Sequence, residues 1–119
     1  MQIQVNTDHN VKGGDLLIKY VKGLLNDSLN SFMDEVTRVE VHISDENGPK
    51  GGDDDLRCTM EARIRGLQPI AVTHHDANID LAIAGAADRI TRTVRKTLEK
   101  RREVKHTQQR LKTEEEDLG

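Results

Sequence analysis

Polar and apolar residues alternate in several short parts of the chain, which is the pattern of a strand with one buried face. In the clearest of these parts, Leu56, Cys58, Met60, Ala62 and Ile64 alternate with polar residues. The alternation predicts four strands, at residues 2–6, 38–43, 56–65 and 68–74.

Two other parts of the chain have apolar residues at three- and four-residue steps, which is the spacing of an amphipathic helix. The first predicts a helix over residues 15–29. The second predicts a long helix from about Ala77 to Glu103 or slightly beyond, with this apolar stripe: Ile79, Ile83, Ala86, Ile90, Val94 and Leu98.

The predicted order is therefore β-α-β-β-β-α, an α+β fold. Each strand has one apolar face and each helix one apolar stripe, so we expect both helices to pack on one face of a four-stranded sheet. The other sheet face should be solvated. The Gly- and Pro-containing residues 45–55 suit a connection between antiparallel strands.

The chain has 119 residues, which suits one domain. No apolar run approaches the roughly 18 residues that span a bilayer, and the first residues do not resemble a signal peptide. The single cysteine, Cys58, excludes an intrachain disulfide. These features predict a cytoplasmic protein with no membrane partner and no small-molecule substrate.

Charge is distributed unevenly along the chain. Residues 1–88 hold 8 basic and 15 acidic residues, residues 89–112 hold 10 basic and 2 acidic, and residues 113–119 hold 4 acidic and none basic. A segment as basic as 89–112 favours a polyanionic partner, although a solvated helix face would explain it too. We expect the acidic residues to belong to a flexible tail.

A helical projection places four basic residues opposite the apolar stripe of the long helix: Arg89, Arg92, Lys96 and Lys100. Arg95 and Arg102 flank this row. Like charges at three- and four-residue spacing disfavour a helix, and phosphate groups would offset that repulsion. The chain has only two aromatic residues, Tyr20 and Phe32, both on or beside the predicted core stripe. Recognition of nucleic-acid bases by aromatic side chains exposed on the sheet is therefore excluded. Recognition of the shape and the phosphate groups of a nucleic acid remains.

Other candidate sites are weaker. His74 and His75 are adjacent on a strand and should point to opposite faces, so with Asp76 they make a poor zinc site. Asp53-Asp54-Asp55 lacks the ligand spacing of a calcium loop. Cys58 alternates with core residues and is interpreted as a small core side chain rather than a nucleophile. We expect no metal, no cofactor and no catalysis.

The element order and the run Asp88-Arg89-Ile90-Thr91-Arg92-Thr93-Val94-Arg95-Lys96 resemble the ribosome hibernation-promoting factors, also called the protein Y family. Leu81-Ala82-Ile83-Ala84 resembles the start of that family's last helix, and residues 14–21 resemble the start of its first. The resemblance covers about residues 2–105. Asp80 stands where the family usually has Tyr, and the first helix offers only Lys19 and Lys22 where the family often has a basic cluster.

The resemblance implies a fold like that of the double-stranded-RNA-binding domain. It implies binding in the mRNA and tRNA channel of the small ribosomal subunit, with inhibition of translation under stress. It also implies rRNA contacts from a set of basic residues: Lys19, Lys22, Arg89, Arg92, Arg95, Lys96, Lys100 and Arg102.

We therefore expect a ribosome-binding α+β domain at residues 1–106, a flexible acidic tail at residues 107–119, and a monomer when the protein is free. The alternative is an interaction module that does not bind the ribosome. In that case the basic helix would dock an acidic protein partner or the chain's own tail.

Overall fold

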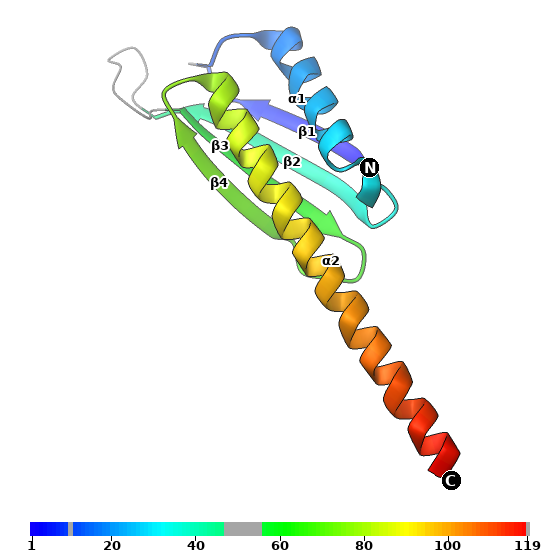
Figure 1. The fold of residues 1–119 in the computed structure, drawn as a ribbon. Helices are drawn as coiled ribbons and strands as arrows, with labels where there is room; N and C mark the ends of the chain where they lie inside the picture. The colour runs from blue at the N-terminus through cyan, green and yellow to red at the C-terminus, as the bar shows by residue number, and fades with distance from the viewer. Residues whose placement is uncertain (10, 47–55, 119) are drawn as a thin grey trace.

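The computed structural model describes residues 1–9, 11–46 and 56–118, without the side chains of residues 106 and 112–118. Its elements follow the predicted order β-α-β-β-β-α, with one short 3-10 helix added after the first helix (Figure 1). They are β1 (Gln2–Thr7), α1 (Gly14–Ser28), η1 (Asn30–Phe32), β2 (Val36–Asp45), β3 (Leu56–Ile64), β4 (Ile70–Asp76) and α2 (Ile79–Leu118).

The four strands form one mixed sheet in the order β1-β2-β3-β4. β1 is parallel to β2, and the other two pairs are antiparallel. The register lines up Val5, Val41, Met60 and Val72 in one row across the sheet. The apolar face of every strand is thus on the same side, as the alternation predicted.

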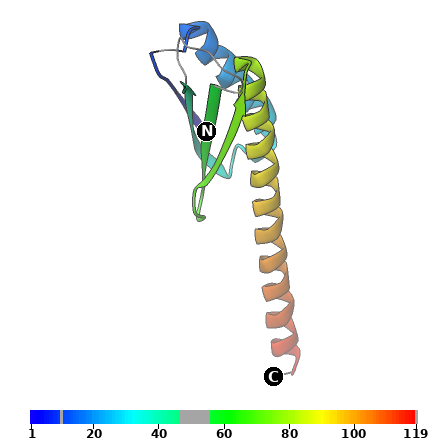
Figure 2. The same cartoon turned by 90° about the vertical axis from the view of Figure 1, so that its left-hand side faces the viewer.

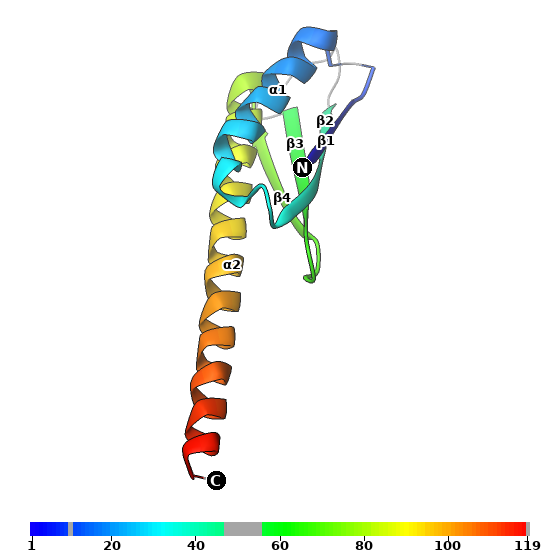
Figure 3. The ribbon, with the colours of Figure 1, turned by 90° about the vertical axis from the view of Figure 1, so that its right-hand side faces the viewer.

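Both helices cover this apolar face and lie beside each other on it (Figures 1 and 3). The inward residues of β2 and β3 are buried beneath them. The helices contribute, among others, these buried side chains: Leu17, Val21 and Leu25 of α1, and Ile83, Ile90 and Val94 of α2. The predicted α+β architecture is confirmed.

The other sheet face carries ion pairs between neighbouring residues of the same strand. Arg38 Nη2 lies 2.8 Å from Glu40 Oε1, and Arg63 Nε lies 3.7 Å from Glu61 Oε1. Arg57 and Arg63 are exposed there. This face is solvated, as expected.

α2 starts where the side chain of Asn78 accepts hydrogen bonds from the backbone N–H groups of Asp80 (2.8 Å) and Leu81 (3.2 Å). This is the usual role of an N-cap asparagine. The first helical residue, Ile79, comes two residues later than predicted.

The other end of α2 differs more from the prediction. The helix continues to Leu118 instead of ending near Glu103, so the expected tail at residues 107–119 is helical as far as Leu118. The physical reason is that no Gly or Pro lies between Ala86 and Leu118, and most residues in this stretch are good helix formers. Whether residues 107–119 act as a flexible unit separate from residues 1–106 stays a prediction.

Candidate nucleic-acid interface

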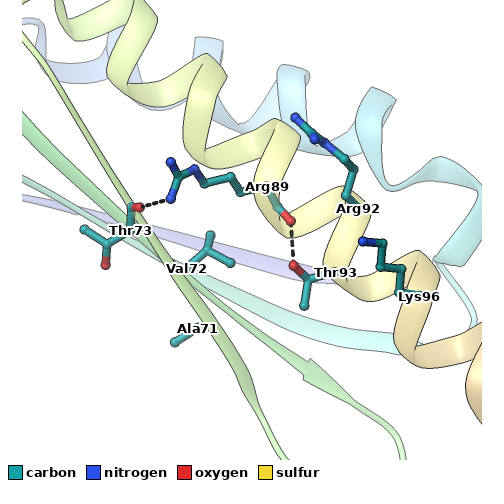
Figure 4. A pocket seen from close by; sticks show the side chains of 7 residues that line it. All are labelled: Ala71, Val72, Thr73, Arg89, Arg92, Thr93 and Lys96. Carbon is teal, nitrogen blue, oxygen red and sulfur yellow. Dashed lines mark hydrogen bonds between the residues drawn. The ribbon is translucent and has the colours of Figure 1, made fainter.

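A groove of about 650 Å³ runs between α2 and β4, the strand at one edge of the sheet (Figure 4). Ala71, Val72 and Thr73 of β4 form one wall. The other wall comes from four residues of α2: Arg89, Arg92, Thr93 and Lys96. Three of the basic residues predicted from the sequence are thus brought together in one open groove.

Arg89 is held against the strand side of this groove. Its Nη1 donates a hydrogen bond to the backbone carbonyl of Thr73 at 3.2 Å, and Thr93 Oγ1 donates to the carbonyl of Arg89 at 2.8 Å (Figure 4). β4 is an edge strand that pairs with β3 along one side. The Thr73 carbonyl can therefore accept this bond on the other side of the strand. The contact fixes one end of the guanidinium while the residue itself stays exposed.

Arg92 has a neighbour that the sequence analysis overlooked. Asp88 Oδ2 accepts a hydrogen bond from Arg92 Nη2 one turn away on the helix. This bond lowers the pKa of Asp88 below its ordinary value and raises the pKa of Arg92. Asp88 therefore competes with any phosphate for Arg92. Acidic and basic residues four apart on a helix are the signal that could have revealed the pair.

The remaining basic residues of α2 lie outside this groove. Lys100 is exposed one turn beyond Lys96. Arg102 Nη2 lies 3.8 Å from Glu35 Oε1, just before the start of β2. Arg95 is seven residues before Arg102 and so shares its side of the helix. These two arginines therefore lie beside the basic row and not within it.

The two lysines of α1 are separated from the groove of α2. Lys22 lines a second groove at the β1 edge of the sheet, together with Gln2 and Gln4 of β1 and Arg38 of β2. Three strand spacings, roughly 14 Å, separate β1 from β4. Lys19 is exposed on α1. Lys22 therefore does not extend the basic groove of α2.

The histidine cluster does not form a metal site within the described residues. His74 packs against Gly85 on the helix-covered side of the sheet, whereas His75 lies 3.9 Å from Glu46 Oε1 on the solvated side. The two rings point to opposite faces, as expected for adjacent strand residues. Asp53-Asp54-Asp55 lies outside the described residues.

Cys58 is fully buried in the core. Burial raises the pKa of its thiol from 9.0 to about 12. Because the thiolate is the reactive form, we expect iodoacetamide to label the folded protein at pH 9 at least about 100-fold more slowly than the urea-unfolded protein. Mass spectrometry over time measures both rates. Equal rates would contradict the buried position of Cys58.

These features define the class of the protein: an α+β domain that presents a basic helix beside an edge strand. The family model described as sigma 54 modulation protein / S30EA ribosomal protein matches residues 3–102. The chain belongs to this family, and the resemblance seen in the sequence is confirmed. The family is one of ribosome-associated modulation factors and is not known to be enzymatic.

Solved structures share the fold. The Protein Y N-terminal domain of Thermus thermophilus matches with a TM-score of 0.66 and 23% identity, over 82% of this chain and 99% of that one. A ribosomal subunit interface protein from Coxiella burnetii matches with a TM-score of 0.61 and 11% identity, over 83% of this chain and 99% of that one. No curated protein matches the chain in sequence.

Among the described residues, no helix is both long and apolar enough to cross a membrane.

Proposed function

We propose that this chain binds the small ribosomal subunit in its mRNA and tRNA channel, contacts rRNA through the basic groove of α2, and inhibits translation under stress. The observation that carries the proposal is the groove itself. It gathers Arg89, Arg92 and Lys96 in a domain of a ribosome-associated family. The proposed site of action is therefore the cytoplasm, where ribosomes work.

The dimensions of the basic row suit a nucleic-acid backbone. From Arg89 to Lys100 the helix rises about 17 Å, at 1.5 Å per residue. None of the residues that line the groove is aromatic, so the bases would not be read by stacking there. Phosphate contacts of this kind position a protein on RNA without reading its sequence.

The rival proposal, in which the basic helix binds the chain's own acidic residues, is disfavoured within a single chain. Lys96 and Glu114 belong to the same helix, and Glu114 comes 18 positions after Lys96, which corresponds to a rise of about 27 Å. A straight helix keeps position 114 away from the groove. An acidic protein partner would still fit the charge of the groove, and the experiment below separates it from the ribosome.

Sedimentation with ribosomes through sucrose, at two salt concentrations and constant magnesium, tests the proposal. We expect the protein to migrate with the small subunit at low salt. If about four phosphates are contacted, the affinity should fall roughly 50- to 150-fold between about 0.05 and 0.2 M monovalent salt. Protein that stays at the top of the gradient at both concentrations would reject ribosome binding and favour the acidic protein partner.

A further inference from the structure

The three basic side chains that line the groove of α2 have different partners. Arg89 donates to the backbone carbonyl of Thr73, an uncharged group, so the positive charge of Arg89 is not compensated there. Lys96 has no ion-pair partner within the described part of the chain. Arg92, in contrast, is paired with the carboxylate of Asp88. An anion that enters the groove therefore meets two uncompensated charges and one that already has a counter-charge.

The Asp88–Arg92 pair lies on the surface of α2. The acidic residue comes four positions before the basic one, which is the favourable order for such a pair on a helix. Figure 4 shows Arg92 directed away from β4, back along α2, whereas Arg89 reaches toward β4. The side chain of Arg92 is 64% exposed and that of Asp88 58%. The pair can therefore open without disturbing the core.

The position of Asp88 matters because of the row of like charges that follows it. Arg89, Arg92 and Lys96 are three and four residues apart, and like charges at these spacings repel one another. The carboxylate of Asp88 relieves part of this repulsion, as a bound phosphate would. A phosphate bound at Arg92 would lie beside the carboxylate, and the two anions would repel each other.

We propose that Asp88 is a built-in competitor of the phosphate groups that bind at Arg92, and that it lowers the affinity of the groove for RNA. The inference rests on the proposed function and deepens it, because it separates Arg92 from its two neighbours. Arg89 and Lys96 meet phosphate without a competing carboxylate. Arg92 meets phosphate by exchanging one anion for another.

This exchange has a consequence for the salt dependence of binding. A basic side chain that neutralises a phosphate releases counterions from the nucleic acid, which makes binding weaker as salt rises. Lys96 should give this effect in full. At Arg92 the carboxylate of Asp88 stays near the phosphate and retains a salt cation, which offsets the release. Arg92 should therefore add little to the salt dependence while Asp88 is present.

The substitution Asp88→Asn tests the competition, with two probes: the small ribosomal subunit and a single-stranded RNA of about 16 nucleotides. We expect affinity for both to rise about three- to tenfold near 0.05 M salt. The plot of log affinity against log salt should steepen by roughly 0.7, the value of one further phosphate contact. Asp88→Glu keeps the charge and the spacing, so it should behave like the unsubstituted chain.

A second pair of substitutions tests whether Asp88 acts through Arg92. Arg92→Gln should leave the salt slope of the unsubstituted chain nearly unchanged, but should reduce the slope of the Asp88→Asn chain by roughly 0.7. Lys96→Gln should reduce the slope by about that amount in both chains. Glu61→Gln, on the solvated sheet face, changes the net charge as Asp88→Asn does and should change the affinity much less.

The outcomes separate the competitor from the proposed function. Small-subunit binding that Asp88→Asn does not strengthen would keep the proposed function and overturn the competitor. A gain on the RNA probe without any binding to the small subunit would do the reverse. An effect of Asp88→Asn that is equally large in the Arg92→Gln chain would also overturn the competitor, since Asp88 would then act as a general charge. Binding to neither probe would reject both proposals.

Discussion

Reversing the charge of Arg92 and Lys96 together, with Arg92→Glu and Lys96→Glu, is expected to weaken binding to the small subunit at least about 100-fold. Each substitution removes an attraction to phosphate and adds a repulsion. Both side chains are exposed in the groove, so the midpoint of thermal unfolding should change by less than about 3 °C. Cosedimentation at low salt measures the first effect and circular dichroism the second.

The matched control reverses two arginines on the opposite face of the sheet, Arg57→Glu and Arg63→Glu. This variant changes the net charge by the same amount. The ion pairs that it removes, between Arg57 and Glu46 and between Arg63 and Glu61, are exposed, and exposed ion pairs contribute little to stability. Its ribosome affinity should fall much less. Equal losses in both variants would show that overall charge, not the groove, drives binding. Unchanged binding by the Arg92 and Lys96 variant would reject the groove as the interface.

Replacing Gly85 with alanine is expected to destabilise the fold by roughly 1–3 kcal/mol, the usual cost of overpacking. A Cβ atom at Gly85 would clash with Cδ2 of the His74 ring. The ring of His74 would have to move out of the space between β4 and α2. Replacing glycine with alanine by itself stabilises a helix by about 1 kcal/mol. A net decrease in the free energy of unfolding, measured with urea, therefore means that the steric cost exceeds this gain.

Gly23 of α1 is the matched control, since a Cβ atom there meets nothing within 4 Å. Gly23→Ala should therefore stabilise the protein by about 0.5–1 kcal/mol. The double variant His74→Ala, Gly85→Ala should recover part of the loss, with a coupling of roughly 0.5–3 kcal/mol. If both glycine variants stabilise the protein alike, the close packing of Gly85 on His74 is wrong.

The sequence predicted the fold well because each element carries a strong local pattern. The alternation in β3 and the stripe from Ile83 to Leu98 each fit only one type of element. The end of α2 could not be placed in the same way, because high charge and low hydropathy suggest a flexible segment even where no helix-breaking residue occurs.

The candidate site was predicted in part. A helical projection places Arg89, Arg92 and Lys96 on one side of α2, but it cannot show which sheet edge they face. The contact between Arg89 and the Thr73 carbonyl depends on β4 being an edge strand, which is a property of the sheet. For the same reason the projection of α1 could not show that Lys22 faces the other edge.

The position of Arg89 has a consequence for aggregation. β4 is an edge strand, and an exposed edge can pair with a strand of another molecule. The guanidinium of Arg89 already donates a hydrogen bond to the Thr73 carbonyl. A strand of another molecule would have to displace this charged side chain before its own backbone N–H could bond to that carbonyl. The residue that we expect to meet phosphate thus also protects the domain from adding strands to its sheet.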